Sequence, residues 1–159
     1  MFKEAFMFNP FKKACFISVV AVIFAARLIF AGEVIQTQES SLWDGVEVDL
    51  LSVKVRNNIL TVKIKFRNEG EENQKISAYY ESCYIMDETN QKKYFVLKDS
   101  DGQYIAGPQG GDHKGGYFEF TIEPSKSKGI WMKFPAPENS PETISLSIPG
   151  VFPFEEVEL

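Results

Sequence analysis

The sequence predicts an all-β protein built as an antiparallel β-sandwich of about seven strands, preceded by an N-terminal signal helix. Apolar and polar residues alternate with a period of two along most of residues 46–148, which is typical of strands with one buried face. The same stretch shows no apolar stripe with helical spacing, and turn-forming residues recur roughly every 10 to 15 residues. Together these patterns favour short paired strands packed in two layers.

The first 31 residues have the pattern of a secretory signal. Three lysines precede an apolar run at residues 14–26, which is too short to cross about 30 Å of hydrocarbon as a helix. Cleavage after Ala31 would therefore remove residues 1–31 as a signal peptide. If the apolar run continues to Ala31, it reaches 18 residues and would instead be kept as a signal anchor, the only part of the chain in contact with the membrane. Both alternatives predict an extracytoplasmic protein, periplasmic or secreted.

The remaining chain is predicted to hold one domain. Residues 32–45 are interpreted as a linker that could include an edge strand, and residues 46–159 as a β-sandwich. The Cys, Trp, Cys signature of immunoglobulin domains is absent, so we compare the chain with the wider Ig-like architecture. The segment 107–116 is rich in glycine, and we expect a mobile loop there.

The first predicted hairpin lies within residues 46–67. Apolar residues alternate with charged ones from residue 46 to residue 50, and the alternation slips at Leu51, which predicts a β-bulge or a switch between sheets. Asn57 and Asn58 tolerate positive φ and can form a tight turn. The strand after this turn has one apolar face, and its other face carries Thr61, Lys63, Lys65 and Arg67.

Five more strands are predicted downstream. The segment 78–87 is apolar on both faces, which suggests the central strand of a sheet. Pro135 and Pro137 end the strand before them, because proline cannot donate a ladder hydrogen bond. The other four strands are predicted at residues 94–97, 117–122, 130–134 and 143–148.

Net charge limits the expected partners. Four of the 17 Lys and Arg residues and one of the 22 Asp and Glu residues lie in the leader, so residues 32–159 carry 13 against 21, a formal net charge of −8. An acidic surface of this size argues against nucleic acid and anionic lipid as partners. Cys83 is the single cysteine of residues 32–159, so no intrachain disulfide can form after cleavage, and we interpret it as a small buried apolar residue.

No combination of residues predicts an enzyme, a cofactor site or a metal site. Cys83 and His113 could act as nucleophile and base, but no third residue orients them and no oxyanion motif is present, so a hydrolase is the least favoured alternative. Asp112 and His113 supply only two of the three or four ligands that a metal ion needs. Residues 99–102, Asp-Ser-Asp-Gly, are interpreted as a β-turn with Gly102 at positive φ.

Aromatic residues that fall outside the inward-facing series are candidate binding residues. If two or three of them share one face of a sheet, they form a stacking platform for sugar rings or a hot spot for a protein partner. The alternative is that they cover a second sheet or the end of the core. Two polar residues of the glycine-rich loop are added, because mobile loops on rigid sandwiches often bind ligands. The candidate binding residues are Trp131, Tyr79, Tyr117, Trp43, Asp112 and His113.

Five phrases of the sequence carry a resemblance to known domains. They are Leu60–Asn68, Tyr84–Asp87, Lys93–Asp99, Trp131–Pro137 and Ile148–Val157. In these phrases the chain resembles bacterial extracytoplasmic Ig-like domains of unassigned function, some of which precede OmpA-like peptidoglycan-binding domains. The resemblance implies a fold and a compartment, and it brings no catalytic motif. We therefore expect a non-enzymatic binding or structural module that contacts an envelope protein, or alternatively a module that binds carbohydrate or cell wall through exposed aromatics.

Overall fold

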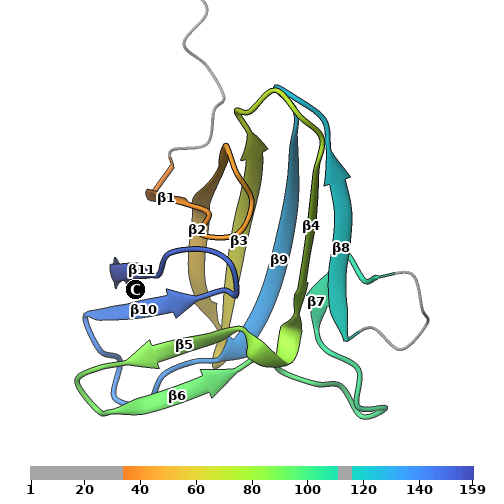
Figure 1. The fold of residues 1–159 in the computed structure, drawn as a ribbon. Helices are drawn as coiled ribbons and strands as arrows, with labels where there is room; N and C mark the ends of the chain where they lie inside the picture. The colour runs from red at the N-terminus through yellow and green to blue at the C-terminus, as the bar shows by residue number, and fades with distance from the viewer. Residues whose placement is uncertain (1–33, 111–115) are drawn as a thin grey trace, which may run out of the picture. The chain divides into compact units, whose positions relative to one another are not determined.

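The computed structural model describes residues 34–110 and 116–159, which contain eleven β-strands and one short 3-10 turn (Figure 1). Every strand pair is antiparallel. The prediction of an all-β antiparallel β-sandwich is confirmed, although with more strands than the seven or so expected. The predicted signal segment at residues 1–31 lies outside the described residues. Within them, no helix is long and apolar enough to span a membrane.

One layer of the sandwich is a five-stranded sheet. Its strands follow the order β1 (Gln36–Glu39), β2 (Val46–Arg56), β3 (Ile59–Asn68), β9 (Ser127–Pro135) and β7 (Ala106–Gly107). Strands β2, β3 and β9 are long and pair over most of their length. Strands β1 and β7 form the two edges, and their shortness limits pairing with other chains.

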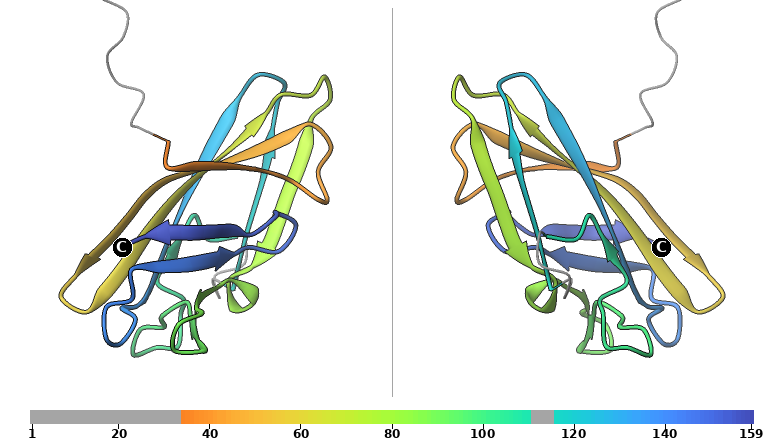
Figure 2. Two further views of the ribbon diagram at one scale, coloured as in Figure 1. Left: turned by 90° about the vertical axis from the view of Figure 1, so that its left-hand side faces the viewer. Right: turned by 90° about the vertical axis from the view of Figure 1, so that its right-hand side faces the viewer.

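The facing layer consists of two smaller sheets. A two-stranded sheet pairs β4 (Gln74–Tyr79) with β8 (Tyr117–Ile122), and a four-stranded sheet has the order β11 (Phe154–Glu158), β10 (Thr143–Ser147), β5 (Tyr84–Asp87) and β6 (Lys92–Phe95). Figures 1 and 2 show the strands of the four-stranded sheet running across the direction of β3 and β9, whereas β4 and β8 run along it. The facing layer thus combines aligned and crossed packing.

The hairpin between β2 and β3 forms as the sequence predicts. Asn57 and Asn58 both have positive φ, at 52° and 59°, as a two-residue type I′ turn requires. Leu50 pairs with Ile64, and the next pair joins Ser52 to Lys63, so Leu51 is the extra residue of a β-bulge. The predicted bulge is confirmed, and it reverses which residues of β2 face the core.

The predicted turn at residues 99–102 is also confirmed. The Oδ1 atom of Asp99 accepts hydrogen bonds from the backbone N–H groups of Asp101 and Gln103, each at 2.9 Å. Gly102 has a φ of 81°, a conformation that glycine adopts without a steric cost. Asp99 therefore serves the local backbone.

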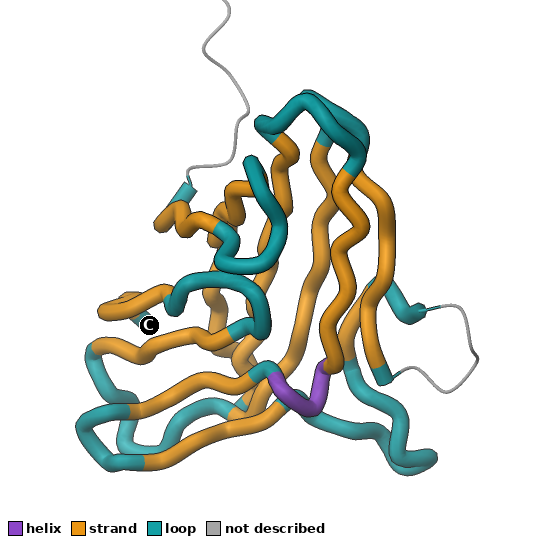
Figure 3. The backbone as a smooth tube through the Cα atoms, viewed as in Figure 1, coloured by secondary structure: helices purple, strands orange, loops and turns teal. Residues whose placement is uncertain are grey.

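The prediction of a single central strand over residues 78–87 is wrong. Strand β4 ends at Tyr79, the 3-10 turn covers Tyr80–Ser82, and β5 then begins in a different sheet (Figure 3). Tyr80 and Cys83 are both fully buried, because the chain crosses between the sheets at this point. In residues 78–87, the apolar residues at both odd and even positions therefore reflect a change of sheet.

The structure has four strands more than the seven predicted: one arises because residues 78–87 belong to two strands, and the other three lie outside the seven predicted strands. Strand β1 forms the edge strand that the segment 32–45 could include. Strand β7 has only two residues, which is too short for any alternation to show. In β11, Phe154 and Val157 are both buried although they are three residues apart, because Glu156 has a φ of 52° and the pairing with β10 is irregular.

The core lies between the layers and is centred on aromatic rings. Phe66 of β3 is fully buried, and its ring centroid lies 5.9 Å from that of Phe118 and 5.8 Å from that of Phe120. Trp43 packs edge-on against the same ring at 6.0 Å. These tilted and edge-to-face arrangements are the ones that aromatic pairs prefer.

One buried polar side chain joins three segments at the end of β3. Asn68 is fully buried, and its Nδ2 atom donates to the carbonyl oxygens of Glu72 and Ile122 at 2.7 Å and 2.9 Å. Its Oδ1 atom accepts from the N–H of Gly70 at 3.0 Å. The amide therefore satisfies three backbone groups that would otherwise lack these partners.

Candidate binding surface

Trp131 lies on the outer face of the five-stranded sheet, in β9, next to the edge strand β7. Its neighbours in β9, Ile130 and Met132, point into the core, and the Trp131 side chain is 40% exposed. In the sheet register it pairs with Lys63 on one side and with Gly107 on the other. A Cβ atom on Gly107 would lie 2.8 Å from Nε1 of Trp131, so the indole lies directly over this glycine. The absence of a side chain at residue 107 leaves room for the indole to approach the backbone of β7 this closely.

Basic residues lie on the same face as Trp131, toward the hairpin end of β2 and β3. Lys54 and Lys133 both pair with Thr61, one from each side, and Lys63 stands in the next cross-strand row beside Trp131. Arg56 follows at the end of β2, in the row beyond Lys54. Among the described residues, none of these four cations takes part in an ion pair. We call this surface the basic face, defined by Lys54, Arg56, Lys63, Trp131 and Lys133.

Some cations elsewhere on the outer faces of the sheets are paired across strands. On the other half of the same sheet, Asp49 accepts a hydrogen bond from Nε of Arg67 at 2.8 Å and lies 3.2 Å from Nζ of Lys65. On the two-stranded sheet, Lys75 lies 3.0 Å from Glu119. The basic face has no such cross-strand pair, because Ser52, Thr61 and Trp131 stand at the positions where an acidic residue could pair with its cations.

The paired half of the sheet should make stability depend on pH. Burial alone would raise the pKa of Asp49, but hydrogen bonds from Arg67, Thr37 and Lys65 outweigh it and lower the pKa below its ordinary value. A lowered folded-state pKa adds stability that is present above the unfolded pKa, about 4, and is lost as the pH falls through the folded pKa. We expect Asp49→Asn to lower the free energy of unfolding by about 1–3 kcal/mol at pH 7 and by less at pH 3, measured by urea denaturation.

Glu119→Gln is the control for Asp49→Asn, since its pair with Lys75 is exposed and should contribute less than about 1 kcal/mol. If Asp49→Asn lowered the free energy of unfolding equally at pH 7 and pH 3, the lowered pKa of Asp49 would be contradicted.

Two tyrosines form a separate aromatic pair on the two-stranded sheet. Tyr79 and Tyr117 face each other across β4 and β8, with ring centroids 5.9 Å apart and planes inclined at 55°. Tyr79 is 61% exposed, and the Tyr117 ring lies over Gly110 as the indole lies over Gly107. Phe118, the neighbour of Tyr117 in β8, points into the core, so Tyr117 and Tyr79 point outward from the two-stranded sheet. Trp131 points outward from the facing sheet, so the tyrosines and Trp131 lie on opposite outer faces of the sandwich.

The other candidate binding residues are not part of these two surfaces. Trp43 is half-buried, and its ring packs against Phe66 and close to Gly150. Asp112 and His113 lie outside the described residues. The structure therefore places Trp131 and the tyrosine pair at separate surfaces and Trp43 against the core.

Cys83 is fully buried at the crossing between β4 and β5. Its Sγ atom lies 3.5 Å from the carbonyl oxygen of Tyr79. Burial raises the pKa of the thiol to about 12, so Cys83 is a neutral thiol near pH 7. A buried neutral thiol is typical of a cysteine that fills space in the core. An activated nucleophile needs a lowered pKa and access to solvent.

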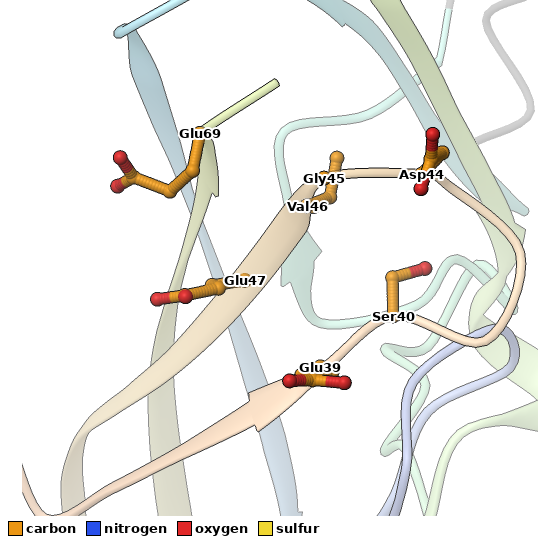
Figure 4. Close-up of a pocket in the computed structure, with 7 residues that line it drawn as sticks. All are labelled: Glu39, Ser40, Asp44, Gly45, Val46, Glu47 and Glu69. Atoms are coloured by element: carbon orange, nitrogen blue, oxygen red, sulfur yellow. The ribbon is translucent and has the colours of Figure 1, made fainter.

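An acidic hollow lies at the end of the five-stranded sheet where β2 begins (Figure 4). It has a volume of about 260 Å³, and four carboxylates line it. Arg67 already binds two of these, Glu47 and Glu69. In the described part of the chain no three His, Cys, Asp or Glu side chains are grouped so that they could hold a metal ion. The lining residues are Glu39, Ser40, Asp44, Gly45, Val46, Glu47 and Glu69.

The structure by itself defines the class of protein, an antiparallel β-sandwich with an exposed tryptophan on one sheet. No family model matches the sequence, and no curated protein matches it. Solved structures of low identity are similar to this chain, among them three bacterial proteins. The YjhA protein from Bacillus subtilis is 12% identical, with a TM-score of 0.43, covering 71% of this chain and 76% of that one.

The other two similar structures have no assigned function. A functionally unknown protein from Listeria monocytogenes is 10% identical, with a TM-score of 0.41 over 80% of this chain and 90% of that one. An uncharacterized β-sandwich protein from Clostridium difficile is 12% identical, with a TM-score of 0.39 over 78% of this chain and 91% of that one.

Proposed function

We propose that this protein is a non-enzymatic binding module that acts outside the cytoplasm and contacts a component of the cell envelope through the basic face. The compartment follows from the leader pattern of residues 1–31. The observation that carries the binding role is Trp131, a large aromatic residue held exposed on a sheet face over Gly107. Tryptophan is among the residues most enriched at binding hot spots.

The position of Trp131 supports binding better than packing. Its indole is supported by Gly107 on the edge strand β7, so the exposed ring has one defined orientation. A pre-oriented side chain loses little conformational freedom when a partner covers it. The exposed part of the ring can therefore contact a partner at little cost in conformational entropy.

The tyrosine pair is the second candidate surface. Tyr79 is more exposed than Trp131, and it adjoins Tyr117. However, the two ring planes are inclined at 55°, so they do not offer one flat platform to a sugar ring. We therefore place the main contact at Trp131.

The test is co-sedimentation of the purified domain with a washed envelope fraction from cells that produce the protein. We expect Trp131→Ala to weaken envelope binding roughly 10-fold or more, as for a hot-spot residue. The free energy of unfolding should change by less than about 1 kcal/mol, because Trp131 lies outside the core.

The matched control for Trp131→Ala is Tyr79→Ala, which removes an exposed aromatic residue from the opposite face. It should leave envelope binding unchanged. Equal binding by wild type and Trp131→Ala would overturn the proposal, and loss of binding by Tyr79→Ala alone would assign the role to the tyrosine pair.

A further inference from the structure

We infer that the basic face binds an anionic polysaccharide, a chain of sugars that carries carboxylate or phosphate groups. The inference rests on the proposed function and names its ligand class. Its basis is the juxtaposition, in three consecutive cross-strand rows, of one exposed tryptophan with four cations that have no carboxylate partner among residues 34–110 and 116–159.

The cations are spread out along the sheet. Lys54 and Lys133 are two strand spacings apart, about 10 Å, with Thr61 between them. Lys63 lies about 7 Å along β3 from that row, since it is two residues further on. A single phosphate or carboxylate would be met by cations directed at one point. Spaced cations on a flat face fit a linear polymer whose charges repeat.

Trp131 supplies the contact that a sugar needs in addition to charge. It stands directly beside Lys63 in the same row, so a sugar ring stacked on the indole brings its charged substituent next to an ammonium group. Aromatic side chains combine a large apolar face with a polar edge, which suits a ligand that is apolar on its ring faces and polar at its rim.

Lysine content argues against a folded protein as the occupant. Lysine is depleted at protein–protein interfaces, whose centres are apolar and rich in aromatic residues. On the basic face the single tryptophan has Lys63 and Lys133 as its nearest cations, Lys54 lies two strands away, and no second aromatic ring stands in these rows. Such a surface lacks the apolar centre that a protein partner would cover.

Net charge argues against nucleic acid. Residues 32–159 have a formal net charge of −8, which opposes the approach of a densely charged duplex. A glycan with spaced charges experiences less of this repulsion, and the local cations can compensate for it. The overall negative charge therefore disfavours densely charged polyanions, whereas the cations of the basic face still allow a glycan with widely spaced charges to bind.

The experiment measures binding by isothermal titration with defined polymers. The probes are polygalacturonate, which carries carboxylates, and a phosphomannan, which carries phosphodiesters between its sugars. Dextran is the neutral control, poly-glutamate is the acidic polypeptide, and a short DNA duplex represents nucleic acid. We expect one of the two anionic polysaccharides to bind, with an affinity that falls as salt is raised. The other three polymers should bind more weakly, by roughly 10-fold or more, because dextran has no charge, poly-glutamate has no sugar ring and the duplex carries denser charge.

Two variants with equal change in charge test the location. Lys54→Gln/Lys63→Gln/Lys133→Gln should weaken binding roughly 10-fold or more and reduce its salt dependence. Lys75→Gln/Lys93→Gln/Lys126→Gln removes three cations from other surfaces and should bind as wild type does. Trp131→Ala should weaken binding while keeping the salt dependence, because it removes no charge.

Several outcomes would overturn the inference. These are no binding of either anionic polysaccharide, equal loss in both triple variants, and tighter binding of poly-glutamate or the DNA duplex. The envelope assay distinguishes a failure of the polysaccharide inference from a failure of the proposed function. If the variants of the basic face lose envelope binding although neither polymer binds, the polysaccharide is wrong and the binding role stands; if they keep envelope binding, the binding role itself fails.

Discussion

Replacing Phe66 with alanine is expected to lower the free energy of unfolding by about 3–5 kcal/mol. Phe66 is fully buried, and three aromatic rings surround it with centroids at 5.8 Å to 6.0 Å. Truncation removes the apolar side chain and leaves a cavity among rings that belong to both layers, so the site cannot collapse easily. Urea denaturation followed by circular dichroism measures the change.

The control for Phe66→Ala is Phe95→Ala, since Phe95 is 51% exposed on the four-stranded sheet. It should cost less than about 1 kcal/mol. A cost at Phe66 that is no larger than the cost at Phe95 would show that the aromatic cluster does not hold the two layers together.

The second large effect is expected at Asn68. Asn68→Ala should lower the free energy of unfolding by about 3 kcal/mol, because three backbone groups lose hydrogen-bond partners at a buried site and each costs about 1–3 kcal/mol unless water replaces the amide. Asn68→Leu fills a similar volume without the hydrogen bonds. It should be about as unstable as the alanine variant.

This pair of variants separates hydrogen bonding from packing at residue 68. Asn73→Ala, at an exposed residue, is the matched control and should change stability by less than about 0.5 kcal/mol. If leucine restores wild-type stability, the site tolerates an apolar residue and the hydrogen-bond account of Asn68 is wrong.

The regular parts of the fold could be predicted because local patterns determine them. The alternation over residues 60–67 reports a half-buried strand, and the pair Asn57-Asn58 reports the turn before it. The slip at Leu51 reports the bulge, since an extra residue changes the phase of everything after it.

The errors arose where one pattern has two physical causes. Burial on both faces over residues 78–87 is produced equally by a central strand and by a chain that changes sheet at Tyr80–Ser82. A signal for the second cause is present: the buried residues are even-numbered up to Tyr80 and odd-numbered from Cys83 onward. Strand β11 was missed because the positive φ of Glu156 disrupts its alternation.

The candidate surface was predictable only in part. Alternation in β9 is enough to direct Trp131 outward, and its exposure agrees with that. The basic face could not be foreseen, because Lys54, Lys63 and Lys133 come from three strands and meet only through the register. The net negative charge of the chain also gave no indication of the basic face, since the excess of acidic residues lies on other surfaces.

The separation of charge along β2 and β3 has a consequence for how the protein meets its partner. The acidic hollow lies at one end of this ladder and the unpaired cations of the basic face lie at the other. Such a molecule has an electric dipole, and a charged surface exerts a torque on it within roughly one Debye length, about 8 Å at physiological ionic strength. An approaching anionic layer would therefore favour orientations in which the hairpin end of β2 and β3, where Lys54 and Arg56 lie, faces the layer before contact.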